Sequence, residues 1–214
     1  MKKKSAARRV VRKRSPQQRP PGYELFFAPL QVALDPNDLE RVQFAYFCSK
    51  YGHAKQKREE GGRYFDHPKG AAWIYVFELG GRDPRVIIGL LLHDMSEDTY
   101  LLSPYRLSLN FGVDVALDVG ALTKLPRGKE TIIQYLRRVI FRGAWTILEK
   151  LCDRLHNLRT LGRCSAEKRK KQIAETRRYH LPMLIPALRR CGKPWSGYAD
   201  ILKRLINEAI AQHE

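Results

Sequence analysis

Apolar residues recur every three to four positions along most of this chain, which is the period of an α-helix that buries one face. Three places also carry a signal for a helix start, in which a side-chain oxygen that can cap the first turn precedes a proline. These pairs are Asp35-Pro36, Asp83-Pro84 and Ser103-Pro104. The pattern therefore predicts helices that begin at these three points.

The same periodicity predicts helices across the rest of the chain. We expect them at about residues 36–51, 67–79, 84–93, 104–109, 113–122, 130–141, 145–161, 166–190 and 196–212. The helix that starts at residue 84 is apolar nearly all round, as a central buried helix would be. Runs of alternating β-branched residues between tight turns are absent from the sequence. The expected fold is all-α.

The composition fits one medium-sized domain with a large positive charge. The chain has 214 residues, with 40 Lys and Arg against 22 Asp and Glu, and a net charge of +18. No apolar run approaches the ~20 residues of a membrane-spanning helix, and no apolar stretch follows the basic start, as it would in a signal peptide. The four cysteines are scattered without a C-x-x-C pair, so we expect buried thiols. These features indicate a cytoplasmic protein without a membrane partner.

The first 22 residues differ in composition from the rest. They hold nine Lys or Arg and no acid, which is half of the net charge, together with three prolines and almost nothing apolar. Such a segment cannot bury enough surface to offset its ordering entropy, so we expect residues 1–22 to be a disordered tail on a domain at 23–214. An arm that contacts nucleic acid or the ribosome and a merely solvated tail both fit this composition.

A polar cluster interrupts the most apolar of the expected helices. His93 and Glu97 are four residues apart, as are Asp94 and Asp98, so an imidazole and three carboxylates project into one sector at the helix end. Carboxylates packed together repel, and a divalent cation with the imidazole as nitrogen ligand is the usual compensation. A metal site is the simplest interpretation, and a hydrated helix end with unrelated acids is the alternative.

Two further strings carry chemistry of the same kind. The string R-Y-F-D-H-P places His67 at a helix start, and D-R-L-H-N-L-R-T-L places Asp153, Asn157 and Thr160 along one helical stripe. In this second string we interpret His156 as a supporting residue, because it points about 100° away from its neighbour Asn157.

These strings resemble a known family. The order His67, His93-Asp94, Asp153 is similar to the metal-ligand order of HD-type phosphohydrolases. More narrowly, H-D-x-x-E-D-T, F-G-V-D-V-A followed by L-T-K-L, and D-R-L-H-N-L-R-T-L occur in the order found in the hydrolase domain of the RelA/SpoT homologue family. The similarity covers roughly residues 40–190. It implies an HD-domain helical bundle and a Mn²⁺-dependent pyrophosphohydrolase that converts guanosine tetraphosphate or pentaphosphate, (p)ppGpp, to GDP or GTP and pyrophosphate.

The resemblance assigns roles residue by residue. Four residues would bind Mn²⁺: His67, His93, Asp94 and Asp153. Two would orient and deprotonate the attacking water: Glu97 and Asp98. The substrate would be bound by Arg58, Asn157, Arg159, Thr160 and Lys124. Lys124, with Arg127 and Lys129 nearby, is expected on a loop at the pocket mouth, where ordinary surface charge is the alternative interpretation.

The chain also departs from the family pattern. Glu59 stands where many relatives have a basic residue after the arginine, which puts substrate preference in doubt. Gly143 and Trp145 stand where the family often has an acidic and a basic residue, which puts the packing there in doubt.

Three classes of function remain open at this point. The first is a small alarmone hydrolase that stands alone, because the chain beyond about Thr160 supplies only two more helical patterns. The second is an HD-type hydrolase that prefers another nucleotide, such as an adenosine alarmone or NADPH. The third is a non-catalytic protein that binds nucleic acid or the ribosome through its tail. The third class requires binding that survives Asp153→Ala and disappears when residues 1–22 are deleted.

Overall fold

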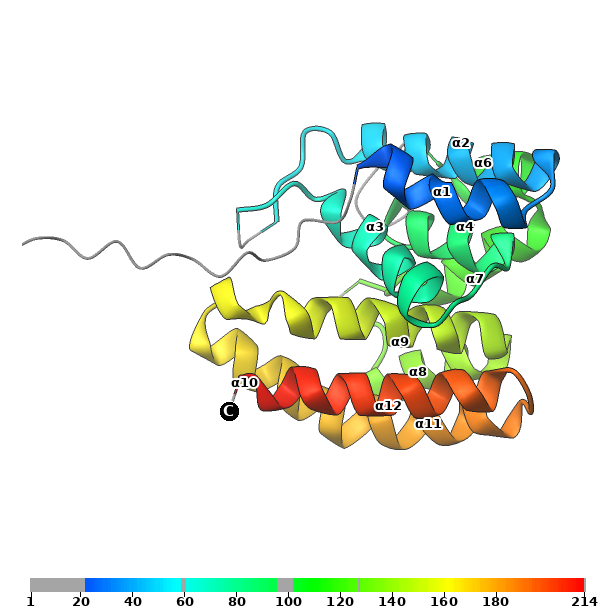
Figure 1. Ribbon diagram of the computed structural model, residues 1–214. Coiled ribbons are helices and arrows are strands. Elements are labelled where there is room, and N and C mark those ends of the chain that lie inside the picture. The colour runs from blue at the N-terminus through cyan, green and yellow to red at the C-terminus, as the bar shows by residue number, and fades with distance from the viewer. Residues whose placement is uncertain (1–21, 59–60, 96–101, 127, 214) are drawn as a thin grey trace, which may run out of the picture.

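The computed structural model describes residues 22–58, 61–95, 102–126 and 128–213 (Figure 1). Within these ranges all the regular elements are helical, and one isolated bridge pairs Lys57 with Arg63. The α-helices are α1 (Tyr23–Ala33), α2 (Pro36–Gly52), α3 (Asp66–Trp73), α4 (Pro84–Leu92), α6 (Pro104–Phe111), α7 (Val113–Leu122), α8 (Ile132–Arg142), α9 (Ala144–Arg159), α10 (Ala166–Glu175), α11 (Leu181–Arg190) and α12 (Trp195–Ala211). Two π-helical turns, Ile74–Glu78 and Thr176–His180, and a 3₁₀ turn, Leu161–Arg163, join some of them. The all-α prediction is confirmed.

The three predicted helix starts are confirmed as caps. The Asp35 carboxylate accepts hydrogen bonds from two backbone N–H groups of the first turn of α2, at 2.9 and 3.0 Å. Asp83 caps α4 and Ser103 caps α6 in the same way, at 2.9 and 3.3 Å. The caps satisfy backbone donors that a helix start leaves open. Local signals therefore decide where these helices begin.

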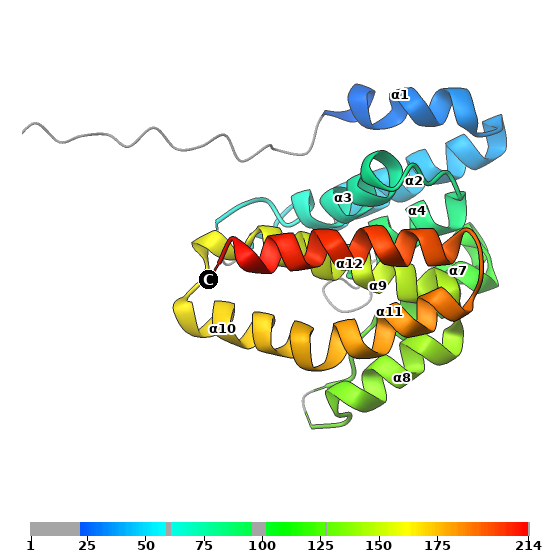
Figure 2. The same ribbon diagram turned by 60° about the horizontal axis from the view of Figure 1, so that its bottom comes forward.

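The helix α1 was not predicted. Its N-cap is Gly22, which has no capping side chain, and Pro29 lies inside it. Phe26, Phe27 and Leu30 are nevertheless fully buried, and Phe26 and Phe27 pack their rings against aromatic residues that include Tyr46 of α2. Tertiary packing of aromatic side chains holds this helix where the local signals are weak. Figure 2 shows α1 lying outside α2.

The helix α9 runs through the middle of the molecule. It contacts α3, α4 and α7 on one side and α8, α11 and α12 on the other (Figures 1 and 2). Twelve of its sixteen residues are buried, including Glu149, Lys150, Asp153 and Arg154. The helix α4 beside it is buried from Val86 to Leu92, as predicted. Charged side chains that sequence periodicity would place on a surface are thus enclosed between two layers of helices.

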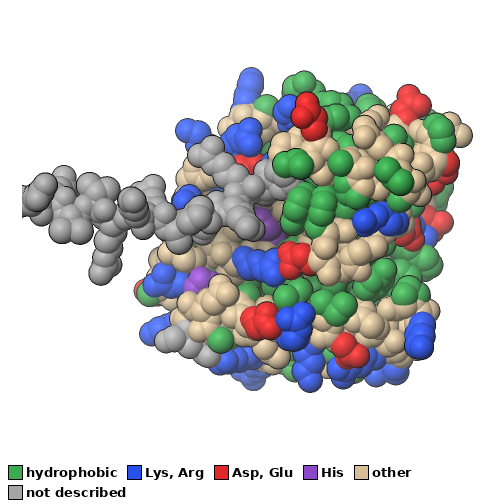
Figure 3. Space-filling model, in the orientation of Figure 1, with side chains coloured by type: hydrophobic (Ala, Val, Ile, Leu, Met, Phe, Trp, Pro, Cys, Tyr) green, Lys and Arg blue, Asp and Glu red, His purple; other side chains and the backbone are tan. Residues whose placement is uncertain are grey.

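Several other expectations concern the surface and the tail. No helix in the described ranges is long and apolar enough to cross a membrane. Figure 3 shows Lys and Arg side chains scattered over the face in view, mainly on its left and along its lower edge. The prediction of buried thiols is wrong in part, because Cys152 is buried whereas Cys48 and Cys164 are half-buried and Cys191 is exposed. The predicted tail lies outside the described residues except for Gly22.

Candidate metal centre

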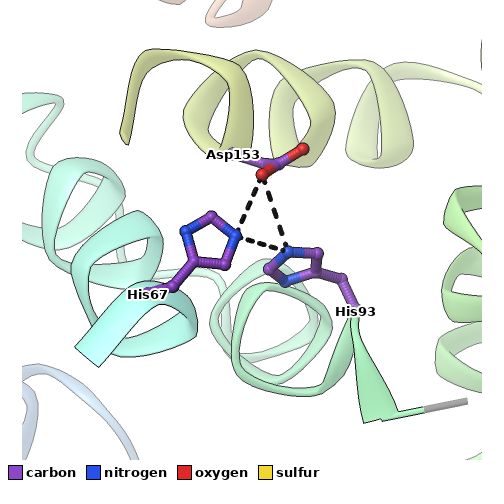
Figure 4. A group of neighbouring side chains, drawn as sticks. All are labelled: His67, His93 and Asp153. Atoms are coloured by element: carbon purple, nitrogen blue, oxygen red, sulfur yellow. Dashed lines mark hydrogen bonds and ion pairs between the residues drawn. The ribbon is translucent and has the colours of Figure 1, made fainter. Parts of the chain in front are cut away.

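Three helices bring His67, His93 and Asp153 to one point (Figure 4). His67 is in the first turn of α3, His93 follows the last residue of α4, and Asp153 is in the interior of α9. One ligand atom of each side chain lies within 4.8 Å of the other two. His67 Nε2 is 3.1 Å from Asp153 Oδ1 and 3.3 Å from His93 Nε2. All three residues are buried, with exposed fractions of 2%, 6% and 5%.

Asp94 completes the group. Its Oδ1 is 3.2 Å from Nε2 of His93, and its Oδ2 is 3.5 Å from Nε2 of His67. The Tyr64 hydroxyl donates a hydrogen bond of 3.1 Å to Oδ2 and so orients the carboxylate. The four side chains named by the H…HD…D order therefore lie together, although they come from segments up to 86 residues apart.

The donor set suits a divalent cation. Imidazole nitrogens together with carboxylate oxygens bind first-row divalent metals well. Such donors lie roughly 2.0–2.2 Å from the metal, so two ligands of one ion are at most about 4.4 Å apart. The separations from His67 Nε2 and His93 Nε2 to the carboxylates, 3.1–3.7 Å, fall in this range.

The charges of these four side chains also favour a bound cation. Burial lowers the pKa of His93, but the carboxylates of Asp94 and Asp153 outweigh it and raise this pKa to about 9. Burial lowers the pKa of His67. Without a cation, a proton on His93 supplies part of the positive charge that the two carboxylates require. A divalent cation among these donors would take over that role, so the residues fit a metal.

Lys150 is a member of this centre that the sequence interpretation missed. Its Nζ is 2.7 Å from Asp153 Oδ2, while the Asn157 amide donates a 2.6 Å hydrogen bond to Oδ1. Burial alone would raise the pKa of Asp153, yet Lys150 and the two histidines lower it well below its usual range. The spacing of three residues between Lys150 and Asp153 puts both on one helix face, and that signal was available in the sequence.

A cavity of about 300 Å³ opens over the centre. Four of the predicted substrate residues line it: Arg58, Lys124, Asn157 and Thr160. The Arg58 guanidinium donates a 2.9 Å hydrogen bond to the Asn157 side-chain oxygen, so the chain Arg58–Asn157–Asp153 joins the cavity wall to the metal donors. Lys57, Arg154 and Lys168 also line the cavity. The wall is thus strongly positive around a floor that contains carboxylates.

Arg159 lies elsewhere. It is absent from the described cavity wall, and its guanidinium donates two hydrogen bonds, of 2.6 and 2.8 Å, to Glu78. Arg159 is in the last turn of α9, and its guanidinium reaches Glu78, the last residue of the π-helical turn Ile74–Glu78. A motif that runs along a helix contains positions that point away from the site, and Arg159 is one of them.

The remaining predicted residues have other outcomes. Glu97 and Asp98 lie outside the described residues, as do Glu59 and Arg127. Gly143 caps the start of α9 with a φ of 120°, which favours glycine.

Trp145 follows in the first turn of α9. It donates a 2.9 Å hydrogen bond to Asp83 and packs under the Arg85 guanidinium at 4.4 Å. Neither Gly143 nor Trp145 is among the described residues of the cavity wall, so these two departures concern packing.

Comparisons with known proteins give relatives that are named for reactions of guanosine nucleotides. No family model matches the chain. The chain is 37% identical over 153 residues, 69% of its length, to a guanosine-3′,5′-bis(diphosphate) 3′-pyrophosphohydrolase of Aquifex aeolicus, of which it covers 22%. It is 34% identical over 157 residues, 70% of its length, to a GTP pyrophosphokinase of Streptomyces antibioticus, of which it covers 18%. The chain thus spans about a fifth of the length of these curated relatives.

A solved structure extends the comparison to the fold. It is described as a metazoan orthologue of SpoT that hydrolyses ppGpp, and it matches with a TM-score of 0.64 at 22% identity. The match covers 84% of this chain and 96% of the other. The two chains share one helical fold.

Proposed function

Because the chain belongs to the RelA/SpoT homologue family, we propose that it is a metal-dependent 3′-pyrophosphohydrolase of (p)ppGpp, with Mn²⁺ as the cation. One observation carries the proposal. His67, His93, Asp94 and Asp153 converge within ligand distance at the floor of a cavity whose wall is basic. A substrate with four or five phosphates needs both features, a cation at the reacting phosphorus and positive charge around the other phosphates.

The proposed reaction is a displacement at phosphorus. Water attacks the phosphorus attached to the 3′ oxygen and the bond to that oxygen breaks. The 3′ oxygen takes up a proton to become a hydroxyl, and the products are pyrophosphate and GDP or GTP. A divalent cation held by His67, His93, Asp94 and Asp153 would lower the pKa of water and polarise phosphoryl oxygens. In the family pattern, Glu97 and Asp98 orient this water and accept its proton. Proximity and charge neutralisation then account for most of the acceleration.

The described residues supply orientation and charge. Lys150 keeps Asp153 ionised and holds its second oxygen, so that Oδ1 faces the centre. Asn157 bridges Asp153 and Arg58 and places the guanidinium at the cavity wall, where it can bind a phosphate. Lys124 and Thr160 are the further proposed substrate contacts. Arg159 is left out because Glu78 engages its guanidinium.

Hydrolysis fits the cavity better than synthesis, although some relatives are named for synthesis. Transfer of a pyrophosphate group between two nucleotides needs room for both. The cavity of about 300 Å³ lies at the lower end of the roughly 300–1,000 Å³ that small-molecule sites occupy. Such a volume is small for two nucleotides at once, which favours hydrolysis.

The test uses the purified protein of 214 residues with Mn²⁺ and a panel of nucleotides. The panel contains guanosine tetraphosphate and pentaphosphate, the adenosine counterpart and NADPH, with pyrophosphate and phosphate release measured for each. We expect pyrophosphate release from the guanosine compounds, highest kcat/KM for one of them, and loss of turnover when a chelator removes the metal. Faster turnover of the adenosine compound or of NADPH would identify that compound as the substrate in place of (p)ppGpp. If no nucleotide is turned over, the proposed enzymatic activity is wrong.

A further inference from the structure

His93 and His67 both face the candidate metal centre through Nε2, but their other ring nitrogens have different partners. Nδ1 of His93 is 2.8 Å from the backbone carbonyl of Leu90. A carbonyl only accepts hydrogen bonds, so this contact places a proton on Nδ1 and, in the neutral ring, leaves the lone pair on Nε2. The helix that carries His93 thus sets its orientation as a nitrogen ligand.

For His67 the partner is a second imidazole. Its Nδ1 lies 2.9 Å from Nδ1 of His156, which comes from α9. Two ring nitrogens form a hydrogen bond only when one carries a proton and the other a lone pair. For Nε2 of His67 to offer its lone pair to a cation, the proton of the neutral ring must sit on Nδ1. Nδ1 of His156 must then be the acceptor, and the proton of His156 must sit on its Nε2.

The packing around the pair keeps it in place. Gly70 lies three residues after His67 on α3, and a Cβ at this position would come within 2.2 Å of Nε2 and 2.3 Å of Cδ2 of His156. A larger residue at position 70 would therefore displace the His156 ring. His67 itself is only 2% exposed. The absence of a side chain at Gly70 is what lets the two imidazoles approach each other.

We propose that His156 is a positioning residue of the metal centre, an inference that rests on the proposed function. Its Nδ1 accepts a hydrogen bond from the protonated Nδ1 of His67 and so selects the tautomer in which Nε2 of His67 faces Asp94 and Asp153 with a lone pair. Partners of this kind behind a metal ligand commonly change metal affinity about 10- to 100-fold. The role needs no contact between His156 and the substrate.

The first test distinguishes two properties of His156, its hydrogen-bond acceptor and the volume of its side chain. Mn²⁺ affinity is measured by calorimetry for the wild type, His156→Leu and His156→Asn, with metal-free thermal unfolding as the folding control. Leu fills much of the space of the imidazole but cannot accept a hydrogen bond from His67, so His156→Leu should weaken Mn²⁺ binding about 10- to 100-fold. Asn is smaller but offers an acceptor oxygen, so it should recover most of the affinity. A packing role predicts the opposite ranking, with Asn worse than Leu.

A second variant and a spectroscopic measurement complete the test. Gly70→Ala removes no polar atom, yet it should weaken Mn²⁺ binding by displacing His156. With ¹⁵N-labelled histidine and diamagnetic Zn²⁺ in the site, NMR should show Nδ1 of His67 protonated and Nδ1 of His156 unprotonated.

Two outcomes overturn this inference and leave the proposed function intact: the opposite placement of these protons, or wild-type Mn²⁺ affinity in His156→Leu. A wild-type protein that binds no divalent cation overturns both.

Discussion

Two clusters of buried charge lie on different faces of α9, and they balance their charges in different ways. Glu149 and Lys150 are neighbours in the helix, but their side chains point about 100° apart. Lys150 joins Asp153 and the histidines at the metal centre. Glu149 instead faces Asp118 of α7 and Arg85 of α4.

In the second cluster, carboxylates are neutralised by arginine side chains of the same cluster. Asp118 is 1% exposed and forms ion pairs with Arg85 at 2.6 Å and with Arg142 at 2.8 Å. Glu149 is also 1% exposed, and neither of its carboxyl oxygens has a hydrogen-bond partner among the described residues. Burial raises its pKa well above the ordinary value, and the nearby Asp118 adds to this effect. Gly89 of α4 leaves the space that the carboxyl group fills. Burial thus favours the protonated, uncharged form of this side chain.

The comparison shows which kind of buried charge indicates a site. At the metal centre, the donor atoms converge on one point below a cavity, and their charge balance is completed by a proton or a cation. In the second cluster, Arg85 and Arg142 balance Asp118 and the more exposed Asp114, while burial favours an uncharged Glu149. None of these side chains is on the described cavity wall. Burial of charge is common to both, so convergence of donors on an accessible point is the distinguishing feature.

Replacement of Asp153 should have the largest effect. Asp153→Ala removes a proposed metal ligand, so hydrolysis should fall at least about 1,000-fold at saturating Mn²⁺. It also leaves Lys150 buried without its carboxylate, which should lower the free energy of unfolding by about 3 kcal/mol. Initial rates and urea denaturation measure the two effects. Wild-type activity in this variant would contradict the proposed centre.

Replacement of Asp118 is the matched change in the other cluster. Asp118→Ala removes the buried carboxylate that Arg85 and Arg142 share. Both arginines keep an ion pair with the more exposed Asp114 and some access to solvent. We expect the free energy of unfolding to fall by about 2–3 kcal/mol, with kcat per folded molecule unchanged within about twofold. Urea denaturation and active-site-normalised rates test this. A large loss of kcat in folded protein would show that the clusters are coupled.

Replacement of Glu149 should change how stability depends on pH. In the wild type the folded state holds a proton that the unfolded state releases above about pH 4.5, so stability falls as pH rises through this window. Glu149→Gln removes this loss, and the variant should gain up to about 1.4 kcal/mol per pH unit relative to wild type within the window. Denaturation between pH 4 and 8 measures the gain. Glu208→Gln, at a side chain that is 52% exposed, is the control that should show no such trend.

Replacement of Arg159 should have the smallest effect. Arg159→Ala removes an ion pair with Glu78 at the surface, which is worth less than about 1 kcal/mol. KM for the nucleotide should stay at the wild-type value, whereas Arg58→Ala should raise it by about tenfold or more. Steady-state kinetics on both variants measure these KM values. An equal rise of KM in both would restore Arg159 to the binding site.

The sequence predicted much of the secondary structure because the signals for it are local. The caps at Asp35, Asp83 and Ser103 act within one turn, and helical periodicity marks the buried faces from α2 onward. The helix α1 escaped prediction because aromatic packing against α2 holds it, and that packing joins separate segments.

For the candidate site, the sequence by itself determined the metal-donor types and their order along the chain. The tertiary structure decided that they meet, that Lys150 and His156 stand behind them, and that Arg159 points away. The reason is physical: burial in α9 depends on helices from both halves of the chain. Periodicity within one helix does not show which of its charged side chains those helices enclose, so the same residue types form a cavity floor on one face and a closed ion-pair cluster on another.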